Sequence, residues 1–511
     1  MKKHLLFPAV MGTLLAIVIS VTFVSAAVEV DTEALRDAVT VDGVRAHQQA
    51  LQSIANANGG IREASSPGYD ASVDYVVEQV TNAGYEVTVQ DFEYPYFEER
   101  EPATLKQTAP SEVEYEYLAD FYTMDYSGSG EATAPLQAVD LILPPAAAAN
   151  TSTSGCEPED FDDFIAGNIA LIQRGTCTFA LKAENARDAG AVGVIIFNEG
   201  QPGREDLFGG TLGGPIDGVP PVLSASFAFG TTLNDLISDD FRLTIKVDAF
   251  SEIRTSKNVL AETPDGRDDR VVVVGAHLDS VPNGPGIQDN GSGSAAILEI
   301  ALQMAALDIE PRNKVRFAWW GAEEAGLLGS QYYVDHLSSR QIKDIAVNLN
   351  FDMIGSPNYV PFVYDGDGSA TDTSGPNGSK NIESIFLEYF DEVAQVPVKP
   401  TAFDGRSDYG PFIEVGIPAG GLFTGAEEIK TEEEASVYGG TAGEAYDPCY
   451  HQACDNFDNI NLEALDIMSD AAAHSVLTFA QTTSSVNGTD KGKGNPKFAE
   501  AMDYKGSHLK K

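Results

Sequence analysis

Between residues 271 and 479 the chain alternates short, continuous apolar runs with longer stretches of helical periodicity. Such alternation is typical of a mostly parallel sheet covered by helices. We therefore predict an α/β fold in which a mostly parallel mixed sheet is sandwiched between helices. The apolar runs cover residues 271–274, 315–320, 346–351 and 419–423, and helical stretches cover residues 295–307, 382–393 and 462–479, with a further helix ending near residue 334.

A second, smaller block lies upstream. Residues 169–172 and 192–197 read as buried strands that flank a helical stretch at 179–188, and another strand begins at Pro220. A chain of 511 residues has room for two or three domains. We expect the block from about 130 to 250 to fold on its own, as a mainly β domain with helices, inserted after a helix, helix, strand opening of the larger domain.

Polar residues follow the apolar strands of the larger domain where each strand ends. Because ligands bind at the carboxyl ends of strands in open α/β sheets, we expect these groups to converge on one crevice. A loop bounded by two cysteines adds another histidine. The residues are His277, Asp279, Asp289, Glu323, Glu324, Asp352 and His451.

This combination of side chains predicts a metal site. Imidazole and carboxylate groups suit a divalent, zinc-like cation, and a carboxylate can bridge two such ions. Acidic groups this close to buried strands would otherwise have to be protonated or solvated. Taken singly, each residue has an ordinary structural explanation, but together they favour a binuclear centre.

The charge balance narrows the possible partners. The chain has 32 Lys and Arg residues against 77 Asp and Glu residues, a net charge of −45. Such a charge repels phosphate backbones and anionic lipid, so we predict no nucleic-acid partner and no docking on an anionic membrane.

The N-terminus predicts export. Lys2 and Lys3 precede an apolar run over residues 5–24, and small residues follow at 24–26, so residues 1–26 read as a signal peptide. An uncleaved anchor is the alternative, because the run approaches the ~20 residues that span a bilayer. Pro8 and other residues that dilute the run favour cleavage, after which no membrane-spanning segment is expected.

Export to an oxidising compartment favours disulfides. The four cysteines fall into two pairs that are close in sequence, Cys156 with Cys177 and Cys449 with Cys454. These are the pairings we favour, although four cysteines allow three connectivities and the spacing alone does not choose among them.

Several ordered motifs of the larger block together resemble a known family. They are Gly275-Ala276-His277-Leu278-Asp279-Ser280, Asp289-Asn290-Gly291-Ser292-Gly293, Ala318-Trp319-Trp320-Gly321-Ala322-Glu323-Glu324, Asn350-Phe351-Asp352-Met353-Ile354-Gly355, Gly405-Arg406-Ser407-Asp408 and Asp447-Pro448-Cys449-Tyr450-His451. The chain resembles the secreted double-zinc aminopeptidases of metallopeptidase family twenty-eight, which are leucyl-type enzymes with a zinc-exopeptidase fold.

The resemblance implies a role for each metal ligand. His277 and Asp352 would bind one zinc, Glu324 and His451 the other, and Asp289 would bridge the two. Glu323 would then be the general base, since two neighbouring glutamates can hardly share one coordination position.

Three further residues receive supporting roles. Asp279 is expected to orient His277. Tyr450 would donate to the tetrahedral oxyanion, with a packed aromatic ring as the alternative reading, and Arg406 would hold a substrate carbonyl or carboxylate.

The inserted block resembles a protease-associated (PA) domain, through Gly155-Cys156, the run from Gly167 to Cys177, and Ala189-Gly190-Ala191. That pattern also supports pairing Cys156 with Cys177. The expected division of the chain is a signal peptide over 1–26, peptidase segments over 27–129 and 251–482, the PA insert over 130–250, and a basic C-terminal tail over 483–511.

A weaker signal concerns calcium. Asp466 and Asp470 lie one helical turn apart on the closing helix, where the resembled family can carry a calcium site, and Asp37 could join them. The alternative reading is a solvated helix face.

We therefore expect a secreted metallo-aminopeptidase, extracellular or periplasmic and monomeric, that uses two zinc ions and a calcium ion to release apolar N-terminal residues from peptides. A carboxypeptidase of the same fold is the first alternative, but it needs a cationic pocket for which Arg406 alone is thin support. An inactive, receptor-like protein is the second alternative, and it would require a broken ligand set.

Overall fold

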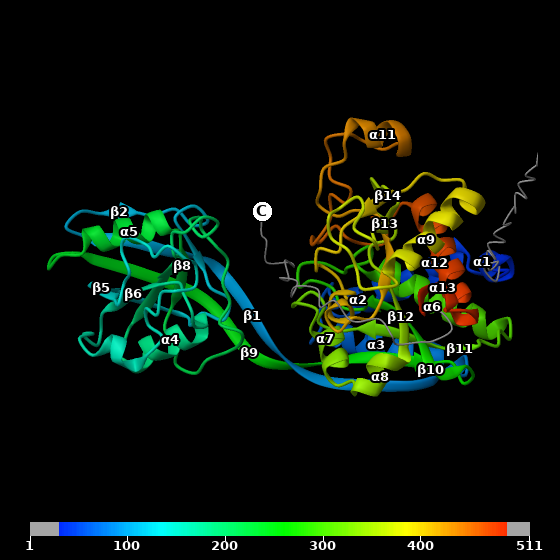
Figure 1. The fold of residues 1–511 in the computed structure, drawn as a ribbon, viewed down its shortest axis with the longest axis horizontal. Coiled ribbons are helices and arrows are strands. Elements are labelled where there is room, and N and C mark those ends of the chain that lie inside the picture. The colour runs from blue at the N-terminus through cyan, green and yellow to red at the C-terminus, as the bar shows by residue number, and fades with distance from the viewer. Residues whose placement is uncertain (1–29, 488–511) are drawn as a thin grey trace, which may run out of the picture.

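The computed structural model describes residues 30–487, which form two bodies joined by two long antiparallel strands (Figure 1). The strands are β1 (Glu86–Ala109) and β9 (Arg242–Glu262), which pair along most of their length. Both strands span the two bodies: β1 leads from the larger, helix-covered body to the smaller one, and β9 leads back.

The larger body is built on a mixed sheet with the order β14-β13-β15-β12-β10-β11-β9-β1-β2, and β4 pairs with the outer part of β9. The central strands β15, β12, β10 and β11 are parallel to one another. The bounds are β2 Val113–Glu114, β4 Gly130–Ala134, β10 Arg267–His277, β11 Asn313–Trp320, β12 Ile345–Phe351, β13 Phe362–Tyr364, β14 Lys399–Thr401 and β15 Ala419–Phe423.

Helices cover both faces of these central strands. The helices are α1 Glu33–Ala38, α2 Val41–Ala57, α3 Pro67–Asn82, α6 Gly291–Ala306, α7 Leu328–Asp335, α8 Ser339–Asp344, α9 Ser379–Glu388 with a π-helical turn over Tyr389–Ala394, α10 Gly410–Glu414, α11 Glu432–Tyr438, α12 Leu462–Gln481 and α13 Ser484–Asn487.

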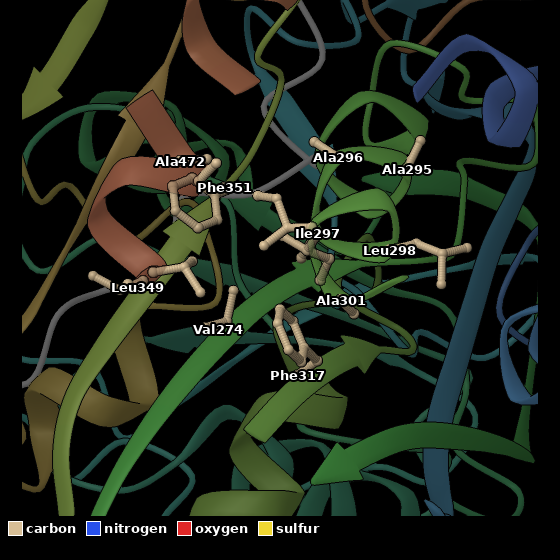
Figure 2. Close-up of a cluster of buried hydrophobic side chains, with 14 of the residues drawn as sticks. Val274, Ala295, Ala296, Ile297, Leu298, Ala301, Phe317, Leu349, Phe351 and Ala472 are labelled. Carbon is tan, nitrogen blue, oxygen red and sulfur yellow. The ribbon is translucent and has the colours of Figure 1, made fainter. Parts of the chain in front are cut away.

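The core explains why the central strands are apolar without alternation. On one face of β10, Val274 packs with Ile297 of α6 and Ala472 of α12, and Figure 2 shows Phe317 and Phe351 from the neighbouring strands in the same cluster. On the other face, alternate residues of β10 pack in a second cluster with Trp320 and with residues of α7. A strand buried on both faces needs apolar residues at every position.

The smaller body is a second sheet with the order β3-β8-β7-β6-β5, in which β5 to β8 are parallel. The outer halves of β1 and β9 pack across one face of this sheet and share its core. The bounds are β3 Phe121–Thr123, β5 Leu136–Val139, β6 Ile169–Gln173, β7 Gly193–Phe197 and β8 Val222–Ala225, with α4 Phe179–Asp188, α5 Phe227–Leu236 and a 3₁₀ turn at Pro158–Phe161.

The predicted fold class is confirmed: a mostly parallel mixed sheet between helices, with a smaller inserted domain of strands and helices. The sequence did not predict β1 and β9 as long strands. The domain boundaries at 129/130 and 250/251 stay predictions, and β3, which precedes residue 130, pairs within the smaller sheet.

The predicted signal peptide and most of the predicted tail lie outside the described residues. Within residues 30–487, none of the helices combines the length and the apolar composition needed to cross a bilayer. The structure contains disulfides between Cys156 and Cys177 and between Cys449 and Cys454.

Candidate metal centre

Four of the predicted metal ligands and the predicted base are placed by the ends of parallel strands or the loops that follow them. His277 is the last residue of β10, Glu323 and Glu324 follow β11, and Asp352 follows β12. Because β11, β10 and β12 are neighbours in the sheet and parallel, their carboxyl ends meet at one edge.

Two groups of three side chains share Asp289, and His277, Glu323 and Glu324 form a third group. Asp289 Oδ1 lies 3.2 Å from His277 Nε2, and its other oxygen, Oδ2, lies 3.2 Å from His451 Nε2. His277 Nε2 is also 3.4 Å from Asp352 Oδ1, and His451 Nε2 is 3.1 Å from Glu324 Oε2. In each group the potential ligand atoms lie within 4.8 Å of one another, so each group can surround one ion.

The loop that carries Asp289 is held from two sides. Asn290 caps α6, accepting from the backbone N–H of Gly293 at 2.9 Å, and its side-chain amide donates to the carbonyl of Phe351 at 2.9 Å. The two carboxylate oxygens of Asp455 accept from the backbone N–H groups of Gln288 and Asp289 at 2.8 and 3.0 Å. This fixes the position of Asp289 without using its own carboxylate.

Asp279 positions three of the neighbouring residues. Its backbone oxygen lies 3.2 Å from His277 Nδ1, and because a carbonyl can only accept, Nδ1 carries the hydrogen and Nε2 keeps a lone pair for a metal. Its two carboxylate oxygens accept from the backbone N–H groups of Glu323 and Glu324 at 3.2 and 3.3 Å. Asp279 therefore orients the loop after β11 as well as the imidazole.

The residues present fit a metal ion. Ser407 donates to Asp352 Oδ2 at 2.5 Å, while Asp352 Oδ1 is buried and has no hydrogen-bond partner among the described residues. That oxygen is the one that faces His277. Burying a carboxylate oxygen that accepts no hydrogen bond costs free energy unless a cation binds it. Imidazole and carboxylate groups, as found here, are the ligands that zinc prefers.

The electrostatics of the cluster show the same need for positive charge. Burial opposes protonation of the histidines, but the surrounding carboxylates, Glu323 foremost, raise the pKa of His277 well above its usual value. The Glu324 carboxylate likewise raises the pKa of His451 to about 10, against the effect of burial. Burial and like-charged neighbours raise the pKa of Glu323. The imidazoles therefore supply, when protonated, the charge that a cation would supply.

Tyr450 and Arg406 lie beside the second group. The Tyr450 ring stacks on the His451 ring with 3.7 Å between centroids, and Arg406 Nη2 donates to the Tyr450 hydroxyl oxygen at 3.1 Å. Arg406 Nη1 also pairs with Glu427 Oε1 at 2.9 Å. His451 has a backbone φ of 56°, a conformation that few non-glycine residues adopt, and it lies within the loop closed by the disulfide between Cys449 and Cys454.

The predicted calcium residues lie away from this centre. Asp470 is partly buried on α12, and burial together with the nearby Asp466 raises its pKa to about 6. Among residues 30–487, the three carboxylates of Asp37, Asp466 and Asp470 do not come together as a group with oxygens within 4.8 Å of one another.

Asp365, Asp367 and Glu383 do form such a group. The oxygens of Asp365 already accept from backbone N–H groups of the same loop, and Asp367 pairs with Lys380. These contacts within the loop account for the positions of the Asp365 and Asp367 carboxylates without a metal ion.

A small cavity of about 70 Å³ opens on the metal groups. Besides the predicted ligands, its wall includes apolar or aromatic side chains from other loops and strands. These are Met353, Tyr364, Phe423 and Ala426.

Two supporting residues were not predicted. Asp455 lies just after the second cysteine of the His451 loop, and its partners are 166 and 167 residues away in the chain. Ser407 was noticed only as part of a motif. Neither has a local signal, because an aspartate or serine in a loop usually serves a turn.

Known proteins resemble this chain in sequence and in fold. A family model described as Peptidase family M28 matches residues 258–476, and one described as PA domain matches residues 133–233. An aminopeptidase of Pseudomonas aeruginosa (strain UCBPP-PA14) is 52% identical, with 83% of this chain and 78% of the relative covered. Leucine aminopeptidase 2 of Arthroderma otae is 39% identical, with 89% and 87% covered.

Among solved structures, BSAP, a zinc aminopeptidase from Bacillus subtilis, is similar to this chain with a TM-score of 0.53. It is 26% identical, and the match covers 86% of this chain and 95% of that chain.

The fold and site together define a metal-dependent hydrolase with an inserted second domain. The chain belongs to peptidase family M28 and carries a PA domain within it. The predicted family, enzyme class and insert are confirmed.

Proposed function

We propose that the protein is a secreted zinc aminopeptidase that releases apolar N-terminal residues from peptides. The observation that carries the proposal is the pair of donor groups that share Asp289, one carboxylate oxygen facing each histidine. The related proteins named aminopeptidase and leucine aminopeptidase, and the zinc aminopeptidase structure, support the same reading.

Two zinc ions fit these groups. His277 and Asp352 would hold one, His451 and Glu324 would hold the other, and Asp289 would bridge them. When bound, the zinc ions would lower the pKa of a water molecule and polarise the scissile carbonyl.

Glu323 is the group left to move the proton. Its carboxylate lies 3.9 Å from His277 Nε2, at the edge of the first donor group, while the adjacent Glu324 faces His451. Glu323 accepts a proton from the attacking water and passes it to the leaving amine.

Tyr450 stabilises the developing oxyanion. Arg406 donates to its phenolic oxygen, which leaves the phenolic hydrogen for the substrate. Because Arg406 is also bound to Glu427, we assign it mainly to holding Tyr450 and, through its remaining N–H groups, a substrate carbonyl.

The small cavity favours an uncharged, apolar N-terminal side chain. Met353, Tyr364 and Phe423 provide an apolar wall, and the carboxylates on the opposite wall favour a free α-ammonium group.

The two alternatives are less well supported by the site. A carboxypeptidase needs an unpaired cation for the substrate carboxylate, but Arg406 is paired with Glu427 and has Glu428 at 3.8 Å. An inactive receptor needs a broken centre, but every predicted ligand and Glu323 is present and brought together.

Secretion, a monomeric state and a calcium ion complete the proposal. Two disulfides support an oxidising destination, and residues 1–26 read as the signal peptide. The repulsion between Asp466 and Asp470 is the property of this helix that supports calcium.

The test is hydrolysis of leucyl-p-nitroanilide and of its N-acetyl derivative, each with and without a chelator. We expect hydrolysis only of the substrate whose amino group is free. A chelator should abolish this activity, and added zinc should restore it. Hydrolysis of the blocked substrate, or activity that resists prolonged chelation, would contradict the proposal.

A further inference from the structure

A second, much larger cavity of about 660 Å³ adjoins the metal centre. The two cavities share Glu324, Arg406, Tyr450 and His451 as wall residues, so they are continuous at the proposed metals. From there the larger cavity extends to the smaller body, whose Tyr122 and neighbouring residues form part of its wall. We call this space the interdomain groove; it lies beside the β1 and β9 strands that join the two bodies in Figure 1.

The groove is the space available to the part of a peptide that follows the scissile bond. The smaller cavity, at about 70 Å³, has room for little more than one side chain. A peptide whose N-terminal residue enters it must continue through the adjoining opening. Cavities of about 300–1,000 Å³ hold ligands of several hundred daltons, so the groove is large enough for a few residues.

The wall of the groove is strongly acidic. Of the described residues that line it, eight are Asp or Glu and one, Arg406, is a Lys or Arg. Glu427 pairs with Arg406 and Glu63 with Arg254, Asp279 and Asp447 are buried, and Glu324 is a proposed metal ligand. The acidic wall residues that remain are Glu98, Glu99 and Asp125. Away from the metals, Glu98 on β1 is exposed and Asp125 of the smaller body is half-buried, and both residues line the groove.

Aromatic side chains lie between these carboxylates. Tyr96 and Phe97 come from β1, and Tyr122 and Tyr126 come from the PA domain. Tyr126 donates to the backbone oxygen of Pro95 at 3.1 Å, which ties this PA loop to β1. The Tyr96 ring already has the guanidinium of Arg254 on its face, with 3.2 Å from Cζ to the centroid. Rings of this kind, beside carboxylates, attract cationic side chains.

We propose that the interdomain groove binds the peptide segment after the scissile bond and selects cationic side chains there, with Glu98 and Asp125 as specificity-determining residues. The inference rests on the proposed aminopeptidase function and adds a substrate class to it. The smaller body is thereby part of the substrate site, since Tyr122 lies on β3 of its sheet and Asp125 bridges to Thr211 within it. A peptide with acidic residues after the first two positions is repelled by the same wall.

The test compares two peptides, Leu-Ala-Lys-Lys-Ala and Leu-Ala-Glu-Glu-Ala, with leucyl-p-nitroanilide as a substrate too short to reach the groove. We expect kcat/KM for the lysine peptide to exceed that for the glutamate peptide by about fivefold or more at low ionic strength. High salt should bring the ratio toward one, because exposed charges are screened. The double variant Glu98→Gln, Asp125→Asn should lower the ratio at low salt severalfold.

The matched control is Asp240→Asn, which removes one exposed carboxylate of the same domain outside the groove. It should leave the ratio unchanged, and melting curves for each variant check that it is folded. A wild-type ratio near one at low salt, or a ratio that the folded double variant keeps, would overturn the inference while hydrolysis of the short amide continues. Failure of the wild-type protein to hydrolyse any of the three substrates would overturn the proposed function, and the inference with it.

Discussion

The two mostly parallel sheets within residues 30–487 differ in what lies at the carboxyl ends of their strands. In the larger sheet, β10 ends in His277 and β12 is followed by Asp352, and both residues line a cavity. In the smaller sheet, β7 is followed by Asn198 and the fully buried Glu199. Both edges therefore present polar groups where a parallel sheet can bind a ligand.

The difference lies in where those polar groups find their partners. The Glu199 carboxylate accepts from the backbone N–H groups of Asn150 and Thr151 and pairs with Arg204 at 3.2 Å. Asp352 keeps one buried oxygen without a hydrogen-bond partner in the described part of the chain, and it faces a histidine. The end of a strand can bind a ligand when its polar groups do not have all their hydrogen-bond partners within the protein.

The largest expected effect follows from removing the shared carboxylate. Asp289→Asn replaces the carboxylate whose two oxygens lie 3.2 Å from His277 and His451. We therefore expect kcat/KM on leucyl-p-nitroanilide to fall by about 10³-fold or more. Zinc content, measured on the same preparation, should fall below two ions per chain. The matched variant Glu199→Gln, at the smaller sheet, should keep both zinc ions and full activity. Equal losses of zinc and activity in the two variants would contradict the claim that only the larger sheet carries the metal site.

A smaller loss is expected when a support is weakened and the donors are kept. Asp455→Asn leaves one of two backbone N–H groups at Gln288 and Asp289 without its acceptor, and we expect zinc affinity to fall about 10- to 100-fold. Zinc titration of the apo-protein measures this. Activity should recover at saturating zinc, whereas a loss that excess zinc does not restore would mean that Asp455 acts in the reaction itself.

The smaller sheet should respond through stability instead. Replacing Glu199 by Gln removes a buried charge from three donors, and we expect the free energy of unfolding of the PA domain to fall by about 1–3 kcal/mol. Denaturant unfolding followed by proteolysis of the PA domain detects this change. An unchanged unfolding curve would show that the contacts of Glu199 do not stabilise the domain.

The last effect concerns a partly buried carboxyl that lies at neither strand edge and whose contribution depends on pH. Burial raises the pKa of Asp470 to about 6, above the roughly 3.9 of an unfolded aspartate. The folded state therefore holds this proton more tightly, so its contribution to stability is lost as pH rises from about 4 through 6. Asp470→Asn should flatten this part of the stability profile relative to wild type, and added calcium should stabilise only the wild-type protein. Identical pH profiles would contradict this assignment.

The sequence predicted the parts of the fold whose pattern is uniform along an element. β10 is apolar at every position from Val271 to Val274 because both of its faces are buried, and the polar residues after this run therefore stood out. That contrast and the cysteine-bounded loop together grouped His277, Asp279, Asp289, Glu323, Glu324, Asp352 and His451, and the family resemblance then divided them into ligands, base and supporting residue.

The long strand β1 was not predictable in the same way. One part of it packs against the larger body and the other on the smaller sheet, so the buried face changes along its length. Irregularities in its pairing with β9 near Glu99, Glu101 and Gln107 also interrupt the alternation. Asp455 was missed for a different reason, because its role exists only through contacts across more than 160 residues of sequence.

The central claim is that two adjacent glutamates divide the work, Glu324 holding metal and Glu323 moving the proton. The direct measurement is zinc content and kcat on leucyl-p-nitroanilide for Glu323→Ala, with Glu324→Ala as its neighbour control. We predict that Glu323→Ala keeps two zinc ions per chain and loses turnover by about 10²- to 10⁴-fold, while Glu324→Ala loses a zinc ion as well as activity. Loss of zinc from Glu323→Ala, or near-normal turnover by it, would contradict the account.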